Sequence, residues 1–213
     1  MAQLDTVERI LDAAEALFAE RGFAETSLRT ITSTAGVNLA AVNYHFGSKK
    51  DLIQAVFARF LTPFCEELES ELQAKLAKSE NNSLTTEELM SCLFQTPTMR
   101  GMEDHAERPQ RFMQLLGLAY TQSQGHLRRF IQANYGRYYT QFTELLKQAV
   151  PHLNPVTFYW RLYFMLGATV FTLSSFESMH SILKVDFNEH TSVGDAVDLL
   201  VPALSGMFDA PQQ

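Results

Sequence analysis

Cysteine is scarce in this chain of 213 residues, and Cys65 and Cys92 stand too far apart to form a zinc-binding or redox motif. We therefore expect two reduced thiols, with neither a metal nor a cofactor. A basic leader is also missing, because Asp5 and Glu8 lie where a signal peptide needs basic residues followed by an apolar run. The sequence thus favours a cytoplasmic location.

A long apolar run is absent as well. The most hydrophobic stretch, Leu162 to Phe176, is free of charged residues but bounded by Arg161 and Glu177. It falls short of the ~20 predominantly apolar residues that cross a bilayer. We expect a buried helix there and no membrane segment.

The motifs that mark common enzyme classes are missing too. The chain has no phosphate-binding glycine motif and no nucleophile elbow, and none of its six histidines is three or four residues from another. The sequence therefore offers no candidate catalytic site and predicts a protein that is not an enzyme.

Basic residues are outnumbered, since 17 Lys and Arg face 24 Asp and Glu and the formal net charge is -7. Such a balance argues against a protein that coats nucleic acid without regard to sequence. The window from Thr26 to Lys50 differs, because it holds Arg29, Lys49 and Lys50 and no acidic residue. A local patch of this kind can contact phosphates while the rest of the molecule repels them.

Hydrophobic residues make up 46% of the chain, enough for a sizeable core, and their spacing is helical throughout. A first helix is predicted to end at Gly22, and a second to be capped by Thr26 or Ser27. Gly36 makes a tight turn before a third helix, Leu39 to Phe46. No run alternates like a strand, so the predicted fold class is all-α.

Two short helices around a glycine turn fit a helix-turn-helix, although similar hairpins occur in proteins that never bind DNA. The third helix combines small residues with hydrogen-bonding tips at Asn43, Tyr44 and His45, which suits close approach to a groove. The start of the next helix, at Ser48 to Lys50, offers free amides beside two ammonium groups, which suits a phosphate. Phe46 is expected to pack inward and Tyr44 to stay outside.

The segment Ala35 to Leu52, preceded by Ile10 to Phe23, closely resembles the DNA-binding head of TetR-family repressors. The resemblance implies phosphate contacts at the start of the second helix and around the end of the third, by Thr26, Ser27, Arg29, Tyr44, His45 and Lys49. It implies contacts with base edges by Asn38, Leu39, Ala40 and Asn43. Many relatives have Lys at position 39, Gly at 40 and an aromatic residue at 43, so the bases read by this chain cannot be carried over.

The same resemblance implies a TetR-like fold of about nine helices, with an N-terminal three-helix DNA-binding domain over residues 1–50 and an effector-binding and dimerisation domain over residues 51–213. The helical stretches Phe158 to Leu183 and Val193 to Phe208 would form the interface of a homodimer. A two-fold dimer in turn implies a double-stranded operator of approximately palindromic sequence.

Segments of the body, such as Leu115 to Ala119 and Trp160 to Ala168, resemble the PsrA group of fatty-acid-responsive TetR repressors. A long-chain fatty acid or acyl-CoA would then release the DNA and control genes of fatty-acid metabolism. Apolar and aromatic residues that could wall an acyl tunnel, or simply form core, are Phe112, Leu116, Tyr120, Tyr135, Tyr139, Phe142, Phe164 and Met165. Two alternatives stay open: a repressor of efflux genes that answers to aromatic or cationic drugs, and a helical lipid carrier that does not bind DNA.

Overall fold

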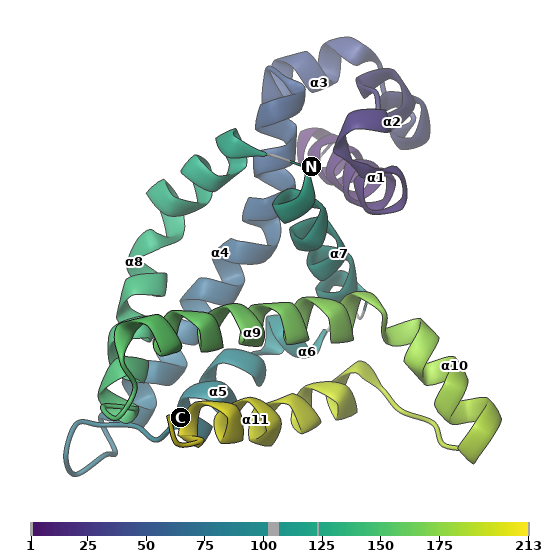
Figure 1. Cartoon of the computed structure of the whole chain (residues 1–213). Coiled ribbons are helices and arrows are strands. Elements are labelled where there is room, and N and C mark those ends of the chain that lie inside the picture. The colour runs from purple at the N-terminus through teal and green to yellow at the C-terminus, as the bar shows by residue number, and fades with distance from the viewer. Residues whose placement is uncertain (1, 102–106, 123, 213) are drawn as a thin grey trace.

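The computed structural model describes residues 2–101, 107–122 and 124–212, and within them the chain forms eleven helices and no strand (Figure 1). The all-α prediction is confirmed. In chain order the helices are α1 (Ala2–Glu25), α2 (Leu28–Ala35), α3 (Leu39–Phe46), α4 (Lys49–Leu76), α5 (Thr86–Phe94), α6 (Pro97–Arg100), α7 (Arg108–Thr121), α8 (Gly125–Ala149), α9 (Pro155–Ser174), α10 (Phe176–Phe187) and α11 (Val193–Asp209).

Helices α1 to α3 form a small head, and its local turns follow the sequence signals. Regular helical geometry breaks at Gly22, where φ is 80° and ψ is 169°, and Phe23 folds back onto Phe18 with ring centroids 5.5 Å apart. The Thr26 hydroxyl donates to the carbonyl oxygens of Leu17 and Gly22. The end of α1 is thereby fixed against the start of α2.

Three capping residues define the ends of α2 and the start of α3. The Ser27 side chain accepts a hydrogen bond from the amide of Thr30, and that of Asn38 accepts one from Ala41. Gly36 adopts the left-handed conformation, with φ 63° and ψ 37°. The two helices have eight residues each and are too short to be stable alone, so these caps and the packing of Ile31 and Val42 hold them.

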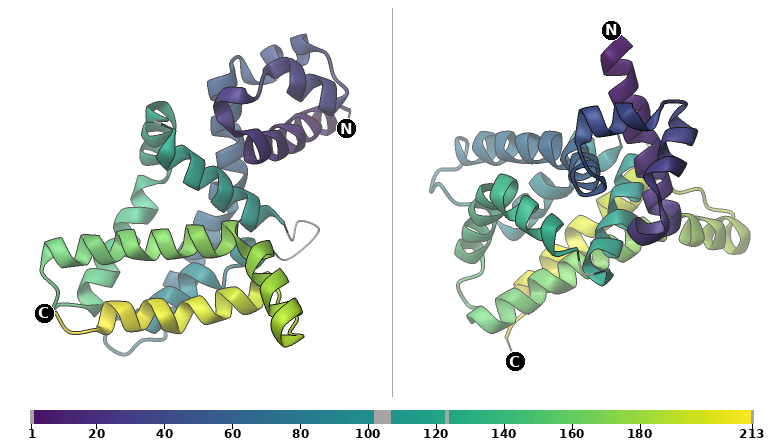
Figure 2. Two further views of the ribbon diagram at one scale, coloured as in Figure 1. Left: turned by 45° about the vertical axis from the view of Figure 1, so that its right-hand side comes forward. Right: turned by 90° about the horizontal axis from the view of Figure 1, so that it is seen from above.

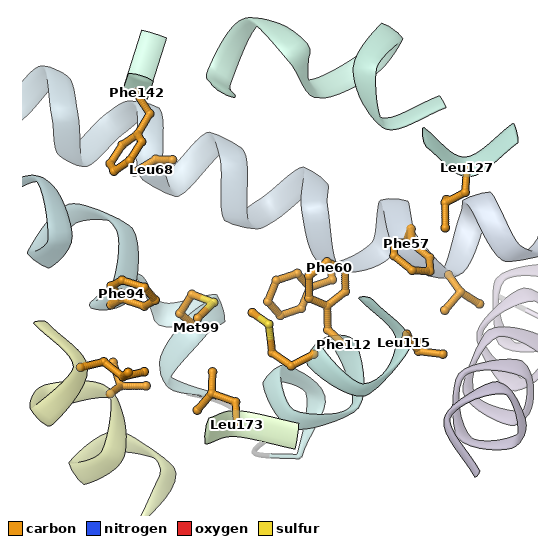
Figure 3. Close-up of a cluster of buried hydrophobic side chains, with 14 of the residues drawn as sticks. Phe57, Phe60, Leu68, Phe94, Met99, Phe112, Leu115, Leu127, Phe142 and Leu173 are labelled. Carbon is orange, nitrogen blue, oxygen red and sulfur yellow. The ribbon is translucent and has the colours of Figure 1, made fainter. Parts of the chain in front are cut away.

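Helix α4 belongs to both the head and the body. It begins at Lys49, so a domain boundary at residue 50 would fall in its first turn, and it continues through Pro63. Its N-terminal half buries Leu52 and Phe57, and Phe60 stacks face to face on Phe112 of α7, with centroids 3.9 Å apart (Figure 3). One apolar face of α4 therefore joins the two parts into a continuous core.

The body surrounds the lower part of α4 with the remaining helices. Helix α9 packs against α7 and α11, and α11 packs against α5, while α8 runs beside α4 (Figures 1 and 2). Both cysteines are free and buried, and burial raises the pKa of the Cys65 thiol to about 12 and that of Cys92 to about 11. High thiol pKa values keep both groups protonated and unreactive.

The stretch from Phe158 to Leu183 is not one helix, and the expected total of about nine helices is too low. Ser175 leaves helical geometry, with φ -105° and ψ 13°, and separates α9 from α10. The adjacent Ser174 hydroxyl donates to the carbonyl oxygen of Phe171. Serine side chains compete in this way with the helical ladder, which accounts for a break inside an apolar stretch.

Helix α10 leans away from the body near the start of α11 (Figure 2). It exposes the apolar side chains of Met179, Ile182, Val185 and Phe187. Among the helices that the structure describes, none is long and apolar enough to span a membrane.

The left-handed turn at Gly36 generates a first prediction. A β-branched residue is strained in this conformation, whereas Asn tolerates it. Gly36→Val should therefore lower the free energy of unfolding by about 2 kcal/mol relative to Gly36→Asn, or the Tm by roughly 4–8 °C in a thermal melt. Both variants place a Cβ close to the Arg9 guanidinium, so the comparison isolates the backbone strain. Equal Tm values would contradict the turn geometry.

Candidate DNA interface and effector site

Helix α3 presents one open face and buries the other. Val42 is fully buried and Phe46 packs partly against the core, whereas Tyr44 is 77% exposed. The predictions for Phe46 and Tyr44 are confirmed. The predicted base-reading residues Asn38, Leu39, Ala40 and Asn43 are all exposed on or beside this face.

The small size of Ala40 and Ala41 lets the backbone of α3 approach a partner closely. The Asn38 side chain has already committed its carbonyl oxygen to the α3 cap, which leaves its NH₂ group as the free donor. His45 is half-buried, and its ring meets the Tyr44 ring edge-on at 5.0 Å. The face can therefore offer amide, phenol and imidazole groups to a groove.

The start of α4 lies directly beyond this face. The Ser48 hydroxyl caps the helix by accepting from the amide of Asp51, and it donates to the Asp51 carboxylate. Lys49 donates to the carbonyl oxygen of Ala24 at 3.4 Å, and Lys50 is exposed. A helix N-terminus flanked by two ammonium groups attracts an anion such as a phosphate.

The three residues predicted to contact phosphates at the start of α2 differ in whether they reach the surface. Ser27 and Arg29 are exposed. The Thr26 side chain is fully buried and bonded inside the head, so in this conformation it fixes the α1–α2 corner and does not reach the surface.

Sequence reasoning missed an ionic cluster where the head meets the body. Arg59 of α4 pairs with three carboxylates of α1, Glu8 at 2.8 Å, Asp12 at 2.6 Å and Glu15 at 3.6 Å. Burial raises the pKa of Glu15, and the charge of Arg59 opposes that shift. A helical wheel of α1 places the three acids on one side, but only the packing of α4 reveals their shared partner.

The eight residues proposed for the effector do not line a single surface. Phe112 and Phe142 are buried in the core, and Leu116 and Met165 pack partly against it. The Tyr135 hydroxyl shares a 2.8 Å hydrogen bond with Thr62. Most of this group therefore has a packing role in the present conformation.

The other three are exposed, at Tyr120, Tyr139 and Phe164. Partial burial raises the pKa of Tyr139, and the nearby phenols of Tyr159, Tyr163 and Tyr120 raise it further. Tyrosines from α7, α8 and α9 thus gather in one region. Phe164 instead stacks on Trp160 on the outer face of α9, with centroids 5.9 Å apart.

A cavity of about 300 Å³ lies between α7 and the junction of α9 with α10. Its walls include Arg111 and Gln114 from α7 and Leu173, Phe176 and Glu177 from the other side. None of the eight proposed effector residues lines it. The Ser174-Ser175 pair that opens this junction was the only local signal, and it does not predict which side chains face one another.

Together these features define a helix-turn-helix protein whose head is joined through one shared helix to an all-helical body. The model of bacterial regulatory proteins of the tetR family matches residues 10–56, and that of the tetracyclin repressor-like C-terminal domain matches residues 92–207. The chain therefore belongs to the TetR family.

Among curated proteins, the probable HTH-type transcriptional regulator YttP of Bacillus subtilis is 29% identical over 92 residues. That match covers 43% of this chain and 42% of YttP, so less than half of the relative is spanned.

Among solved structures, the fatty acid degradation regulator FadR of Bacillus halodurans has a TM-score of 0.62 at 18% identity, over 96% of this chain and 95% of that one. FadR of Bacillus subtilis, solved in complex with stearoyl-CoA, has a TM-score of 0.56 at 16% identity, over 94% and 98%. These likenesses show a shared fold.

The stacking of Phe112 on Phe60 generates a second prediction. Phe112→Ala should lower the free energy of unfolding by about 3–5 kcal/mol, because it leaves a cavity in the core that joins α4 to α7. Tyr139→Phe removes only an exposed hydroxyl and should change it by less than about 0.5 kcal/mol. Thermal or urea unfolding of both variants measures this. A Phe112→Ala protein of unchanged stability would return Phe112 to the candidates for ligand contact.

Proposed function

We propose that this protein is a one-component transcriptional repressor that binds operator DNA in the cytoplasm through its helix-turn-helix head. The observation that carries the proposal is the open face of α3, with Asn43 and Tyr44 exposed, directly beside the free amides and lysines at the start of α4. Membership of the TetR family supports the same conclusion.

Within this proposal, phosphates are contacted by groups around the rim of the head, Ser27, Arg29, Tyr44, His45 and Lys49. Base edges are contacted by Asn38 through its NH₂ group and by Asn43. The side chains of Leu39 and Ala40 offer apolar contact, which suits the methyl group of thymine. Thr26 has an orienting role, since its hydroxyl is spent inside the head.

The protein acts as a homodimer in this proposal. The outer face of α9 exposes Val156, Trp160, Phe164 and Phe171, and α11 exposes Leu199. Apart from its chain neighbours and the backbone of its own helix, a Cβ atom added at Gly167 or Gly206 would meet nothing within 4 Å, so a second copy can approach both helices closely. A large exposed apolar surface is typical of an interface. A homodimer formed through it would have two-fold symmetry, which calls for an approximately palindromic operator.

A third prediction tests DNA binding with a duplex selected from a randomised library by the wild-type protein. Lys49→Ala should flatten the plot of log K against log salt by about 1.8, because a dimer loses one phosphate contact per protomer. Tyr44→Phe should weaken binding by about tenfold per protomer, or about a hundredfold for the dimer, since each protomer loses a hydroxyl bonded to a charged group. Saturation is expected at two copies per duplex.

Thermal melts are the control for both variants, because each changes a side chain at the surface. A variant that loses DNA binding together with several degrees of Tm would have a structural role. No sequence-selective binding by the wild-type protein would favour the helical carrier over the repressor.

The effector that we propose is a long-chain fatty acid or its CoA thioester, as in the PsrA group, with control of fatty-acid metabolism genes. Support comes from the similarity of body segments to that group and from the fold shared with FadR of Bacillus subtilis, which binds stearoyl-CoA. The tyrosines gathered between α7, α8 and α9 offer aromatic walls and hydroxyl donors for such a ligand.

A fourth prediction concerns release of the DNA. Oleoyl-CoA or oleic acid, added to the preformed complex in a gel-shift assay, should dissociate it, and Tyr139→Phe should raise the concentration required without changing DNA affinity. Rhodamine 6G serves as the cationic aromatic comparison. Release by the dye but by neither acyl compound would overturn the acyl assignment in favour of a drug-responsive repressor.

A further inference from the structure

A second segment of this acidic protein is free of acidic residues, and it lies in the body. From Arg108 to Thr143 the sequence has five arginines and no Asp or Glu. Together with the window from Thr26 to Lys50 it holds eight of the 17 basic residues and none of the 24 acidic ones. Positive charge is therefore concentrated in two stretches that are distant along the chain.

The fold brings these two stretches together at the junction of α7 and α8. Gln122, which follows α7, has its side-chain Nε2 2.9 Å from the Cβ position of Gly22 in the head. Ala24, two residues after Gly22, accepts a hydrogen bond from Lys49 through its carbonyl oxygen. Leu127, in the first turn of α8, is buried beside Phe57 of α4 (Figure 3). The start of α8 is thus anchored next to the part of the head that faces phosphate.

Arg128 and Arg129 extend from this anchored turn. Both are exposed, and in the part of the chain that the structure describes neither forms an ion pair. The Arg129 guanidinium lies 3.8 Å from the Cβ position of Gly125, over the first turn of α8. That end of a helix carries a partial positive charge, so the arrangement is repulsive until an anion occupies it.

His126, beside them, lies in the same positive region. Burial lowers the pKa of its imidazole, and the charges of Lys50 and Arg129 lower it further, while Asp51 acts in the opposite direction. Lys50 of the head and Arg129 of the body therefore act on one common side chain. Cations of the head and of the body therefore lie on either side of His126, with the Asp51 carboxylate also nearby.

We propose that Lys50, Arg128 and Arg129, here called the α8 basic surface, bind phosphates of operator DNA that flank the base pairs contacted by the head. The inference rests on the proposed DNA-binding function and extends it from the head to the body. A duplex fits this surface because it presents a phosphate charge every ~1.7 Å along its axis, beyond the few phosphates that one head reaches. The strongly acidic remainder of the chain repels DNA, so positive charge is useful only where the body approaches the head.

The test compares Arg128→Ala/Arg129→Ala with Arg137→Ala, a matched control on the same helix. Arg137 is exposed like the other two, but it pairs with Glu69 at 3.2 Å and lies about 12 Å further along the helix from the head. Two duplexes carry the same selected operator: one is trimmed to the footprint of the head, and the other extends by about ten base pairs, one helical turn, at each end.

On the extended duplex, the double variant should flatten the slope of log K against log salt by at least about 1.8, which is one phosphate per protomer. On the trimmed duplex it should match the wild-type protein, and Arg137→Ala should match it on both. An unchanged slope on the extended duplex, or an equal loss on both duplexes, would overturn the α8 basic surface while leaving the repressor function intact. Absence of selective binding by the wild-type protein would instead remove the proposed function and this extension with it.

Discussion

The burial of one continuous apolar face of α4 is the interaction on which the rest of the structure depends. Its first turns complete the core of the head through Leu52 and Phe57, and the next turn carries Phe60 onto Phe112 in the body. Because protein interiors pack densely, a helix held on both sides cannot move in one part without moving in the other. The head is therefore positioned by the same side chains that organise the body around α4.

Electrostatic contacts supplement this packing at the same junction. Arg59 of α4 gathers three acids of α1, one of them the buried Glu15, whose charge would otherwise be costly. The arginines of α7, Arg108 and Arg111, also lie close enough to lower the pKa of Glu15. Three helices thus meet around one set of charges, and the cavity beside Arg111 lies at the edge of that set.

The sequence predicted most of the head because its signals are local. Ser27, Gly36 and Asn38 cap or turn the chain through bonds to residues only a few positions away, and the structure has each of them in that role. The burial of the Thr26 side chain could not be predicted, because its partners, Leu17 and Gly22, lie on the preceding helix. In the body, an apolar residue suits a core and a ligand tunnel equally, so only packing could separate Phe112 from Tyr139. The break at Ser175 and the cavity beside it depend on contacts between helices that no spacing rule describes.

The break in helical geometry at Gly22 affects how movement in the body reaches the head. Its backbone conformation is one that other residues essentially never adopt, and the amide of Gln122 fills the space where any side chain would begin. Head and body therefore meet at this corner through the side chain of Gln122. A displacement of the end of α7 therefore reaches the corner from which α2 starts through this one side chain.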